Sequence, residues 1–310
     1  MSVIVLGSIN MDVVMRVAEL PRPGETVNAL DQQLYPGGKG ANQAIASARA
    51  GAPTTILGAV GEDEYGSGLR RNLEENGVDT RHLVTLSGSP TGQAAITVSK
   101  AGENMIVVLP GANYRYEQPQ AGGVEEIGLS KSTVRLTQFE MPLAEIEKFF
   151  RPSGEGTGVR ILNPAPALPE GRYLFDLSDI IIVNETELAV YADVPVEQTQ
   201  AQDSAVALAR SLMTRPEQWV IVTLGAQGAI VISAEEEIAV QGSPAEVVDT
   251  TGAGDCFCGA LAAQLCECTP IQDAVTFANI AAGIAVTRHG AGPSMPTRQE
   301  VINQACLSAR

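Results

Sequence analysis

Strand-like and helix-like segments alternate along almost the whole chain. Short runs rich in Val and Ile, such as DIIIV at 179–183 and WVIVT at 219–223, have the length and composition of buried strands. Between such runs lie longer stretches with helical spacing, such as the alanine-rich GANQAIASARA at 40–50. Alternation of this kind predicts a mainly parallel sheet that is covered by helices on both faces.

The same pattern predicts where each element lies. Strands are expected at 3–7, 54–60, 133–138, 159–163, 179–183 and 219–224, with 228–233 and 237–241 as a possible hairpin. Helices are expected at 40–50, 63–76, 142–151, 203–213, 254–267, 271–287 and 297–308. Since no internal repeat or flexible linker separates these elements, we expect residues 1–310 to form a single α/β domain.

Two segments break the alternation. Residues 12–34 and 91–109 lack helical periodicity and alternate with a period of two around Gly, Pro and Asn turns. We expect them to pair into a small antiparallel sheet beside the main one, with AGENMI at 101–106 as its hairpin turn. Such a sheet could act as a lid over a binding cleft.

Composition argues against several classes of protein. The chain has 310 residues and a net charge of −16 without a Lys/Arg cluster, so a nucleic-acid partner is not expected. The apolar runs are too short to cross a bilayer, and MSVIVLGSIN reads as a first strand rather than a signal peptide. We therefore expect a cytoplasmic protein without a membrane partner. Only His82 and His289 are present, and neither lies near a nucleophile motif, which argues against a hydrolase triad.

Four of the five cysteines lie close together, between positions 256 and 268. Cys256 and Cys258 are two residues apart on an expected helix, so they point in different directions and cannot chelate one metal ion. We interpret the cysteines as small buried apolar side chains. The sequence assigns no regulatory role to Cys256, Cys258, Cys266 or Cys268.

The most specific motif is DTTGAGDCFCGAL at 249–261. Gly252, Ala253 and Gly254 lead directly into an apolar helix, so successive backbone N–H groups can converge on one point. With the positive end of the helix dipole, they would form an anion hole for a transferring phosphoryl group. Asp255, in the first helical turn, would lie beside that point. In isolation, the acid would more simply be a residue that favours the helix dipole, but the neighbouring motifs favour a functional role.

Polar residues suited to a sugar follow the first strand and the next loop. Asn10 and Asp12 in GSINMD lie past the carboxyl end of the strand, where α/β sheets place ligands. A carboxylate can accept hydrogen bonds from two adjacent hydroxyls, although a turn alone would also explain this pair. In PGGKGANQA at 36–44, adjacent glycines including Gly38 allow close approach of a ligand, and Lys39 and Asn42 can donate to it.

Further polar groups end other strands. Glu140 in TQFEMP is one, although a surface acid before a proline-started helix would look the same. Asn184 and Glu187 in IIIVNETE suit a capping box and equally suit two groups that hold the water shell of Mg²⁺ near triphosphate oxygens. In VTLGAQGAI at 222–230, a strand, a glycine turn and a second strand could lie along a nucleotide. The residues concerned are Thr223, Gly225 and Gly228.

Taken together, these motifs resemble those of the PfkB family of carbohydrate and nucleoside kinases. The resemblance covers nearly the whole chain and rests on GGKGANQAIASARAGAPTTILGAVGEDEYG at 37–66 and DTTGAGDCFCGALAA at 249–263. The form GSINMD followed by PGGKGANQA is similar to the ribokinase branch in particular. The resemblance implies a three-layer α/β/α ribokinase-like fold with a β lid, which family members often use to form homodimers. It also implies transfer of phosphate from ATP to the 5-hydroxyl of D-ribose.

The resemblance further implies roles for individual residues. Asp255 would be the general base, beside an anion hole made by Gly252, Ala253 and Gly254. The sugar would be held by Asn10, Asp12, Gly38, Lys39, Asn42 and Glu140. ATP and its Mg²⁺ would be bound by Asn184, Glu187, Thr223, Gly225, Gly228, Gly254 and Asn279. A K⁺ ion beside the anion-hole loop would be held, several times through carbonyl oxygens only, by Asp249, Thr251, Ala285, Arg288, Gly290 and Ser294.

The sequence leaves other substrates open. The segment 107–118 carries Tyr114 and Tyr116, whose contact with a sugar the sequence does not decide, so 2-deoxyribose and fructose are alternatives to ribose. A nucleoside kinase is a further alternative, but it would need an apolar or aromatic surface for the base, and no aromatic residue lies within 37–44. The alternative from another class is a non-catalytic sugar or nucleotide sensor on the same fold, against which the intact Asp255 argues.

Overall fold

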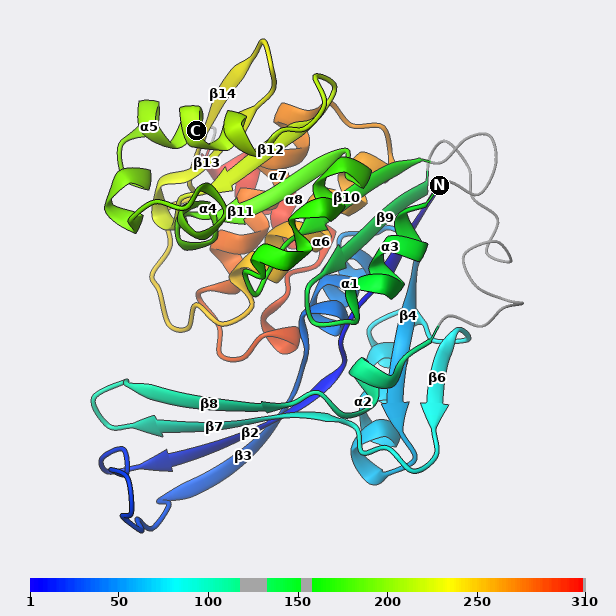
Figure 1. Cartoon of the computed structure of the whole chain (residues 1–310), viewed down its shortest axis with the longest axis vertical. Coiled ribbons are helices and arrows are strands. Elements are labelled where there is room, and N and C mark those ends of the chain that lie inside the picture. Colours follow the sequence, from blue (N-terminus) through cyan, green and yellow to red (C-terminus); the bar gives the residue numbers. More distant parts are fainter. Residues whose placement is uncertain (118–132, 152–157, 309–310) are drawn as a thin grey trace.

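The computed structural model describes residues 1–117, 133–151 and 158–308, and it contains two sheets of different kinds (Figure 1). The main sheet has ten strands, in the order β14-β13-β12-β11-β10-β9-β1-β4-β5, and β6 also pairs with β4. The second sheet has four strands, in the order β3-β2-β7-β8, and projects from one side of the main body. Within the described ranges, no helix is both long and apolar enough to span a bilayer.

The elements have the following bounds. The main sheet comprises β1 (Ser2–Leu6), β4 (Thr54–Gly61), β5 (Val78–Asp79), β6 (Leu83–Leu86), β9 (Thr133–Gln138), β10 (Val159–Asn163), β11 (Ile180–Asn184), β12 (Trp219–Thr223), β13 (Gly228–Ile232) and β14 (Glu237–Gln241). The second sheet comprises β2 (Asn10–Val17), β3 (Asp31–Gly37), β7 (Gly92–Ser99) and β8 (Asn104–Leu109). The helices are α1 (Lys39–Arg49), α2 (Glu64–Glu75), α3 (Leu143–Phe150), α4 (Glu185–Ala192), α5 (Gln202–Leu212), α6 (Ala253–Cys266), α7 (Ile271–Ala285) and α8 (Arg298–Ser308).

Every strand and helix that the sequence pattern predicts is present, with ends that differ by at most two residues. The pairs from β12 through to β5 and β6 are parallel, and only β12–β13 and β13–β14 are antiparallel, so the prediction of a mainly parallel main sheet is confirmed. The pattern did not predict β5 and β6, because strands of two and four residues are too short to show a period.

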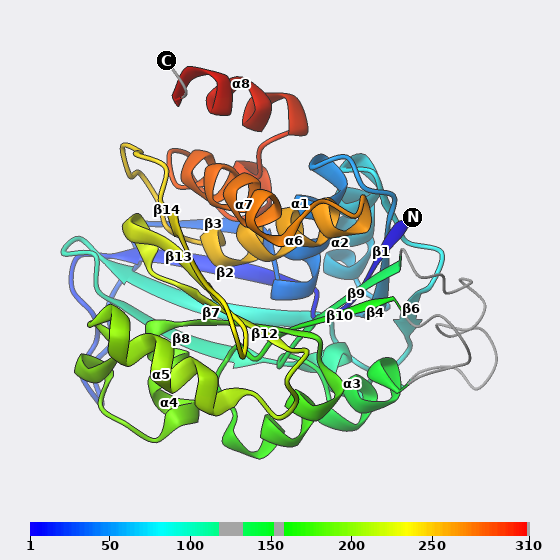
Figure 2. The same cartoon turned by 90° about the horizontal axis from the view of Figure 1, so that it is seen from above.

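The alternation of side chains along each strand builds the two apolar layers. In β1, Val3 and Val5 point to one face of the sheet, whereas Ile4 and Leu6 point to the other, and all four are fully buried. The first face packs against α1, α2, α6, α7 and α8, and the second against α3, α4 and α5 (Figure 2). The three-layer α/β/α architecture is therefore confirmed.

The second sheet differs in two respects from the prediction of an antiparallel lid. The hairpin turn lies at 100–103, and the rest of the predicted turn at 101–106 belongs to β8. The outer pairs β2–β3 and β7–β8 are antiparallel, but the central pair β2–β7 is parallel. The reason is that β2 and β7 both leave the main body in the same direction and lie side by side, while β3 and β8 return outside them. Each outgoing strand forms its antiparallel pair with the strand that follows it in the sequence.

Candidate active site

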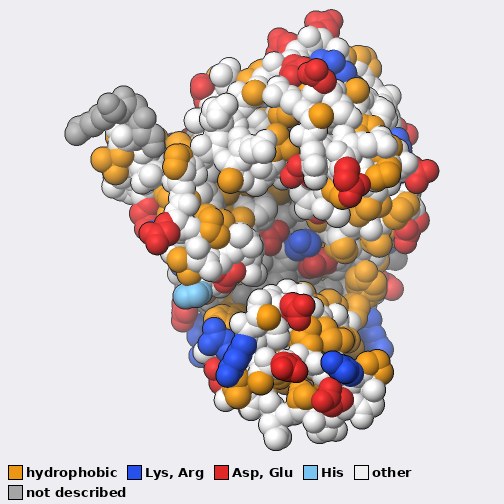
Figure 3. Space-filling view, turned by 90° about the vertical axis from the view of Figure 1, so that its left-hand side faces the viewer, with side chains coloured by type: hydrophobic (Ala, Val, Ile, Leu, Met, Phe, Trp, Pro, Cys, Tyr) orange, Lys and Arg blue, Asp and Glu red, His pale blue; other side chains and the backbone are white. Residues whose placement is uncertain are grey.

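Three cavities adjoin at the carboxyl edge of the main sheet, where parallel strands typically place ligands. A central cavity of about 190 Å³ lies at the amino end of α6 and is lined by Lys39, Glu187 and Asp255 among others. An apolar cavity of about 470 Å³ lies between the β12–β13 turn and α7, and a lid cavity of about 560 Å³ lies under the second sheet. All three share Thr250. In Figure 3 the surface is hollowed between the main body and the second sheet, with acidic and basic side chains at the floor.

The amino end of α6 presents bare backbone to the central cavity. Gly252, the residue before the helix, has φ +76°, and a Cβ there would lie 2.7 Å from the Cβ of Ala291, so only glycine fits. The N–H of Ala253 donates to the Thr250 carbonyl at 3.2 Å. The N–H of Gly254 has no hydrogen-bond acceptor among the described residues and belongs to the first turn, where the helix dipole favours an anion.

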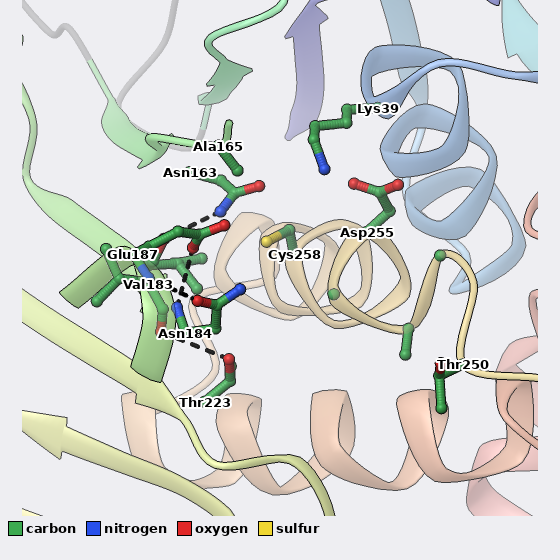
Figure 4. A pocket seen from close by; sticks show the side chains of 14 residues that line it. Lys39, Asn163, Ala165, Val183, Asn184, Glu187, Thr223, Thr250, Asp255 and Cys258 are labelled. Carbon is green, nitrogen blue, oxygen red and sulfur yellow. Dashed lines mark hydrogen bonds between the residues drawn. The ribbon is translucent and has the colours of Figure 1, made fainter. Parts of the chain in front are cut away.

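Asp255 is 7% exposed and faces the central cavity beside these N–H groups (Figure 4). Its two carboxylate oxygens each accept one hydrogen bond from the start of α1. Asn42 Nδ2 donates to Oδ2 at 2.9 Å, and Gln43 Nε2 donates to Oδ1 at 3.0 Å. Two neutral amide side chains therefore hold the Asp255 carboxylate next to a site for an anion.

Lys39 extends into the same cavity, and Figure 4 shows its ammonium directed at the Asp255 carboxylate. The negative charge of Asp255 raises the pKa of Lys39, and Glu140 and Glu187 add to this effect against the cost of burial. Glu140 also accepts hydrogen bonds from the Ser8 hydroxyl and, at 3.2 Å, from the Lys39 backbone N–H. One ammonium thus lies among three carboxylates, two of which, Asp255 and Glu187, line the cavity.

Asn184 and Glu187 form the capping box that the sequence suggested at the start of α4. The Glu187 N–H donates to Asn184 Oδ1 at 2.8 Å, and the Asn184 N–H donates to Glu187 Oε2 at 2.9 Å. Both residues line the central cavity as well, so the cap does not exclude a role towards a ligand. Burial raises the pKa of Glu187, while the hydrogen bond from Asn184 and the charge of Lys39 oppose that rise.

Asp12 lines the lid cavity at the base of the second sheet. Burial, and then repulsion by Glu140 and Asp255, raises its pKa from 3.8 to about 7. Gly37 on β3 leaves the space for this side chain, because a Cβ there would lie 2.2 Å from Asp12 Oδ2. Asp12 therefore lies close enough to Glu140 and Asp255 to be repelled by both. The sequence motifs pointed to each of these acids separately and did not show that they meet.

Asn10 and Gly38 lie just behind Asp12 and line none of the three cavities. The Oδ1 atom of Asn10 accepts a hydrogen bond from Asn113 Nδ2 at 2.7 Å, which leaves its own Nδ2 free to donate. Gly38 caps α1 with φ +90°, and a Cβ there would lie 2.8 Å from the Asn10 nitrogen. These glycine contacts hold the start of α1 against β1 and β2.

The apolar cavity is lined by some of the residues that are expected to bind the nucleotide. Thr223, Gly225, Gly254 and Asn279 line it, together with apolar atoms from Phe257, Val247 and Val286. Asn279 Nδ2 donates to the carbonyls of Val240 and Gln241 at 3.3 and 3.4 Å, so this side chain also anchors the end of β14. Gly228 does not line the cavity. It has φ +102°, and a Cβ there would lie 2.1 Å from the Val240 carbonyl oxygen, so glycine is needed for the close approach of β14.

The residues expected around K⁺ come from two loops that Asp249 joins. Its Oδ1 accepts from the Thr251 N–H and its Oδ2 from the Gly290 N–H, both at 2.9 Å. Arg288 lies between the other members, since its N–H donates to the Ala285 carbonyl at 3.1 Å and its Nη1 donates to the Ser294 carbonyl at 3.5 Å. The six residues therefore form one neighbourhood beside the start of α6.

The two tyrosines in the segment 107–118 do not line any of the three cavities. Tyr116 is 2% exposed and belongs to the apolar layer with α3, whereas Tyr114 is 53% exposed. Residue 118 of that segment lies outside the described residues. Within the described part, the tyrosines therefore give no reason to expect a bulkier or more aromatic sugar site.

Sequence reasoning missed a buried set of amides behind Asp255, namely Gln43, Gln138 and Asn163. Gln138 and Asn163 end β9 and β10, so the rule that drew attention to Asn184 at the end of β11 would have found them. Gln43 follows Asn42 in the glycine-rich motif, and only the packing of α1 against α6 reveals that it reaches Asp255. Asn113, which bonds Asn10, carries no signal in the sequence.

Comparison with known proteins points to one family. The model of the pfkB family carbohydrate kinases matches residues 1–298. The chain is 38% identical to a ribokinase of Haemophilus influenzae over 298 residues, which is 96% of each chain, and 36% identical to a ribokinase of Bacillus subtilis over 301 residues, which is 97% of this chain and 98% of that one. The structure of an Arabidopsis thaliana ribokinase complexed with ribose and ATP superposes with a TM-score of 0.87 at 31% identity and covers 98% of both chains.

Proposed function

The chain belongs to the PfkB family of carbohydrate kinases, and from that premise we propose that it is an ATP-dependent ribose kinase. It transfers the γ-phosphoryl group of ATP to the 5-hydroxyl of D-ribose and releases ribose 5-phosphate and ADP. The choice of ribose is supported by relatives that are named ribokinases and by the likeness to a ribokinase complexed with ribose and ATP. We treat residues 1–310 as one functional unit with the second sheet as its lid.

The observation that carries the proposal is the position of Asp255. Its carboxylate lies at the amino end of α6, in the same cavity as Gly254, and that cavity joins the lid cavity to the apolar one. A hydroxyl that enters from the lid side and a phosphoryl group that enters from the apolar side would meet there. This is the arrangement that in-line phosphoryl transfer requires.

Each residue of the site has a separate role in the proposed reaction. Asp255 accepts the proton of the attacking hydroxyl, and the backbone of Gly252, Ala253 and Gly254 receives the equatorial oxygens of the phosphoryl group. The Gly254 N–H is available for this, whereas the Ala253 N–H would first have to leave the Thr250 carbonyl. The sugar is held on the lid side by Asn10, Asp12, Gly38, Lys39, Asn42 and Glu140. The nucleotide is held by Asn184, Glu187, Thr223, Gly225, Gly228, Gly254 and Asn279. For Gly228 this role is indirect, since the residue shapes the turn.

Two features support a need for Mg²⁺. The central cavity carries Asp255 and Glu187 against the single charge of Lys39, on which Glu140 also acts, so a triphosphate would be repelled without a cation. The second feature is the pair Asn184 and Glu187, a carboxamide and one carboxylate that line this cavity. Such a pair fits Mg²⁺, which keeps several waters and uses one or two carboxylates with phosphate oxygens. Glu187 and Asn184 would hold its water shell, and the ion would neutralise charge on the phosphates.

The cation-activation part of the proposal rests on the Asp249 neighbourhood. K⁺ takes oxygen ligands, and the two loops that Asp249 joins offer several carbonyl oxygens besides the carboxylate. The residues that would hold the ion are Asp249, Thr251, Ala285, Arg288, Gly290 and Ser294. A bound K⁺ would add positive charge beside the start of α6.

A homodimer through the lid is the assembly that the surface supports best. β8 is an edge strand of the second sheet, and its five apolar residues from Met105 to Leu109 are all at least 48% exposed. A long apolar edge strand of this kind is usually covered, because its unpaired backbone invites further pairing. The proposed compartment is the cytoplasm, which supplies ATP and agrees with five free cysteines.

The test is phosphate transfer from ATP across a panel of ribose, 2-deoxyribose, fructose and nucleosides, with ADP release as the readout. We expect ribose to have the highest kcat/KM, because a site built to bond the 2-hydroxyl discriminates against its loss. In Asp255→Asn, kcat should fall by ~10²–10⁴ while the KM for ribose changes much less. A variant with near wild-type turnover would remove Asp255 from its role, and no sugar-dependent ADP release by the wild type would refute the function itself.

A further inference from the structure

A buried row of amide side chains lies behind Asp255, and two of them, Gln43 and Gln138, line none of the three cavities. Gln138 Nε2 donates to Gln43 Oε1 at 2.6 Å, and Gln43 Nε2 donates to Asp255 Oδ1 at 3.0 Å. Gln138 and Gln43 are both 0% exposed. Gln43 therefore reaches the site only through the two residues that its Nε2 bonds, Asp255 and Asn163. We propose that Gln43 is a positioning residue that holds the Asp255 carboxylate in its reactive orientation; this rests on the proposed function.

The direction of the Gln43 amide is fixed from three sides. Its oxygen faces the donor of Gln138, and its nitrogen faces two acceptors, Asp255 Oδ1 and, at 3.2 Å, Asn163 Oδ1. Asn163 is itself oriented by the main chain, because its Nδ2 donates to the Ile182 carbonyl at 3.0 Å (Figure 4). A reversed Gln43 amide would place its oxygen against both acceptors, so the N–H group has to face the carboxylate.

Gln138 gives a second sign that this direction is constrained. Its Oε1 is buried and has no hydrogen-bond partner among the residues that the structure describes. That oxygen lies against Gly7, where a Cβ would be only 2.3 Å away. Turning the amide over would direct the oxygen at Gln43 Oε1 and lose the bond between the two glutamines. An unpaired buried acceptor is unfavourable, and here it accompanies the amide direction that serves Asp255.

The spacing of α1 and α6 is adapted to the same contact. Gly259 lies one turn after Asp255 on α6, and a Cβ there would be 2.3 Å from the Gln43 carbonyl oxygen and 2.6 Å from the Ala46 Cβ. Glycine at this position lets the two helices approach closely enough for the Gln43 side chain to reach the carboxylate. The same face of α6 therefore carries the acid and the space for the residue that holds it.

Asn42 and Gln43 differ in their other contacts. Asn42 holds the second carboxylate oxygen, but the proposed function also gives it the sugar. Gln43 has no role towards the sugar in the proposed function, and its side chain is fully buried. Without it, Asp255 would keep one hydrogen bond, from a residue that a bound sugar competes for. Misplacing a reactive group by about 1 Å can cost on the order of 10²-fold in rate. We therefore expect Gln43→Leu to lower kcat by ~10–100-fold and to change the KM of ribose and ATP less than about threefold.

The experiment compares Gln43→Leu with Gln264→Leu, alone and in the Asp255→Asn background, by steady-state kinetics with ribose and ATP. Gln264 is a matched control: it is a buried glutamine on the same helix as Asp255, and its Nε2 has no hydrogen-bond partner among the described residues. We expect Gln264→Leu to keep kcat within about twofold of the wild type. In the Asp255→Asn background we expect Gln43→Leu to change the residual rate by less than about twofold, since the proposal has Gln43 act on the rate through the carboxylate and not through Asn163.

Several outcomes would overturn the proposal while leaving the function intact. These are a kcat within twofold of wild type in Gln43→Leu, a rise in KM in place of the fall in kcat, or an equal loss of rate in the Asp255→Asn background, which would indicate a general structural defect. If Gln43→Leu does not fold, Gln138→Met takes its place, with an expected loss in kcat of ~3–10-fold because only the orientation of Gln43 is released. A wild-type protein without sugar-dependent turnover would instead remove the proposed function.

Discussion

Replacing Asp12 by asparagine should make the free protein more stable while it weakens sugar binding. Asp12 is half-buried at the base of the second sheet, and burial together with repulsion by Glu140 and Asp255 raises its pKa to about 7. The folded protein thus holds a carboxylate where a charge is unfavourable. Asparagine has the same shape without the charge, so the substitution removes this cost. A residue needed for a ligand is a natural place for such a conflict.

The size of the effect follows from the difference between the two pKa values. A shift from 3.8 to about 7 corresponds to ~4 kcal/mol at most, since each unit is worth about 1.4 kcal/mol. Asp12 is partly solvated and water screens part of the repulsion, so we expect ~2 kcal/mol in the free energy of unfolding at pH 8. Without a carboxylate for the sugar hydroxyls, we expect the KM for ribose to rise by ~10–100-fold.

The sign of the pH dependence is defined as well. The folded state holds the Asp12 proton more tightly than the unfolded chain, so wild-type stability is lost as the pH rises from about 4 to about 7. Above about pH 7 the full cost is present. The gain in Asp12→Asn should therefore be largest at pH 7–8 and fall below ~1 kcal/mol at pH 5.

Urea denaturation at pH 5, 6, 7 and 8, without sugar, measures this gain. The control is Asp31→Asn on the same sheet, an exposed carboxylate that lies 3.9 Å from Arg16, for which we expect a change within ~0.5 kcal/mol. If Asp12→Asn is no more stable than the wild type at pH 8, the reasoning about the buried acid cluster is wrong. A gain of equal size at pH 5 and pH 8 would refute its electrostatic origin.

Three further predictions concern packing, cation and assembly. Gly259→Ala should lower the free energy of unfolding by ~2–4 kcal/mol, because its Cβ would lie 2.3 Å from the Gln43 carbonyl oxygen. The control Gly68→Ala on α2, with nothing within 4 Å of the new Cβ, should raise the free energy of unfolding by ~0.5–1 kcal/mol. Equal effects of the two substitutions would contradict the close α1–α6 contact. Turnover should be faster in K⁺ than in Na⁺ buffer, and Asp249→Ala, which unties the two loops, should abolish that difference; a variant that keeps it would argue against this cation site. Val107→Lys, at a position 70% exposed on β8, should shift the mass measured by light scattering from dimer to monomer, and a monomeric wild type would rule out the lid dimer.

The sequence by itself determined the layers of the fold and the chemical identity of the site. Periods of two and 3.6 residues depend only on local geometry, so strands such as β9 and β10 could be predicted to the residue. The glycines at 252 and 254 and the acid at 255 are adjacent in the chain, and a helix start turns that adjacency directly into bare backbone beside a carboxylate, the arrangement from which we propose phosphate binding.

The tertiary structure decided what depends on contacts between distant segments. The parallel pairing of β2 with β7 follows from the direction in which each strand leaves the body, which neither strand's own sequence encodes. Gln43 and Asp255 are 212 positions apart, and only the close approach of α1 to α6 joins them. The pKa of Asp12 likewise depends on burial and then on Glu140 and Asp255, two acids that folding brings to one edge of the sheet. Local patterns define the elements and the reactive groups, whereas their orientation and charge state come from packing, since hydrogen bonds and electrostatic fields depend on distance in space.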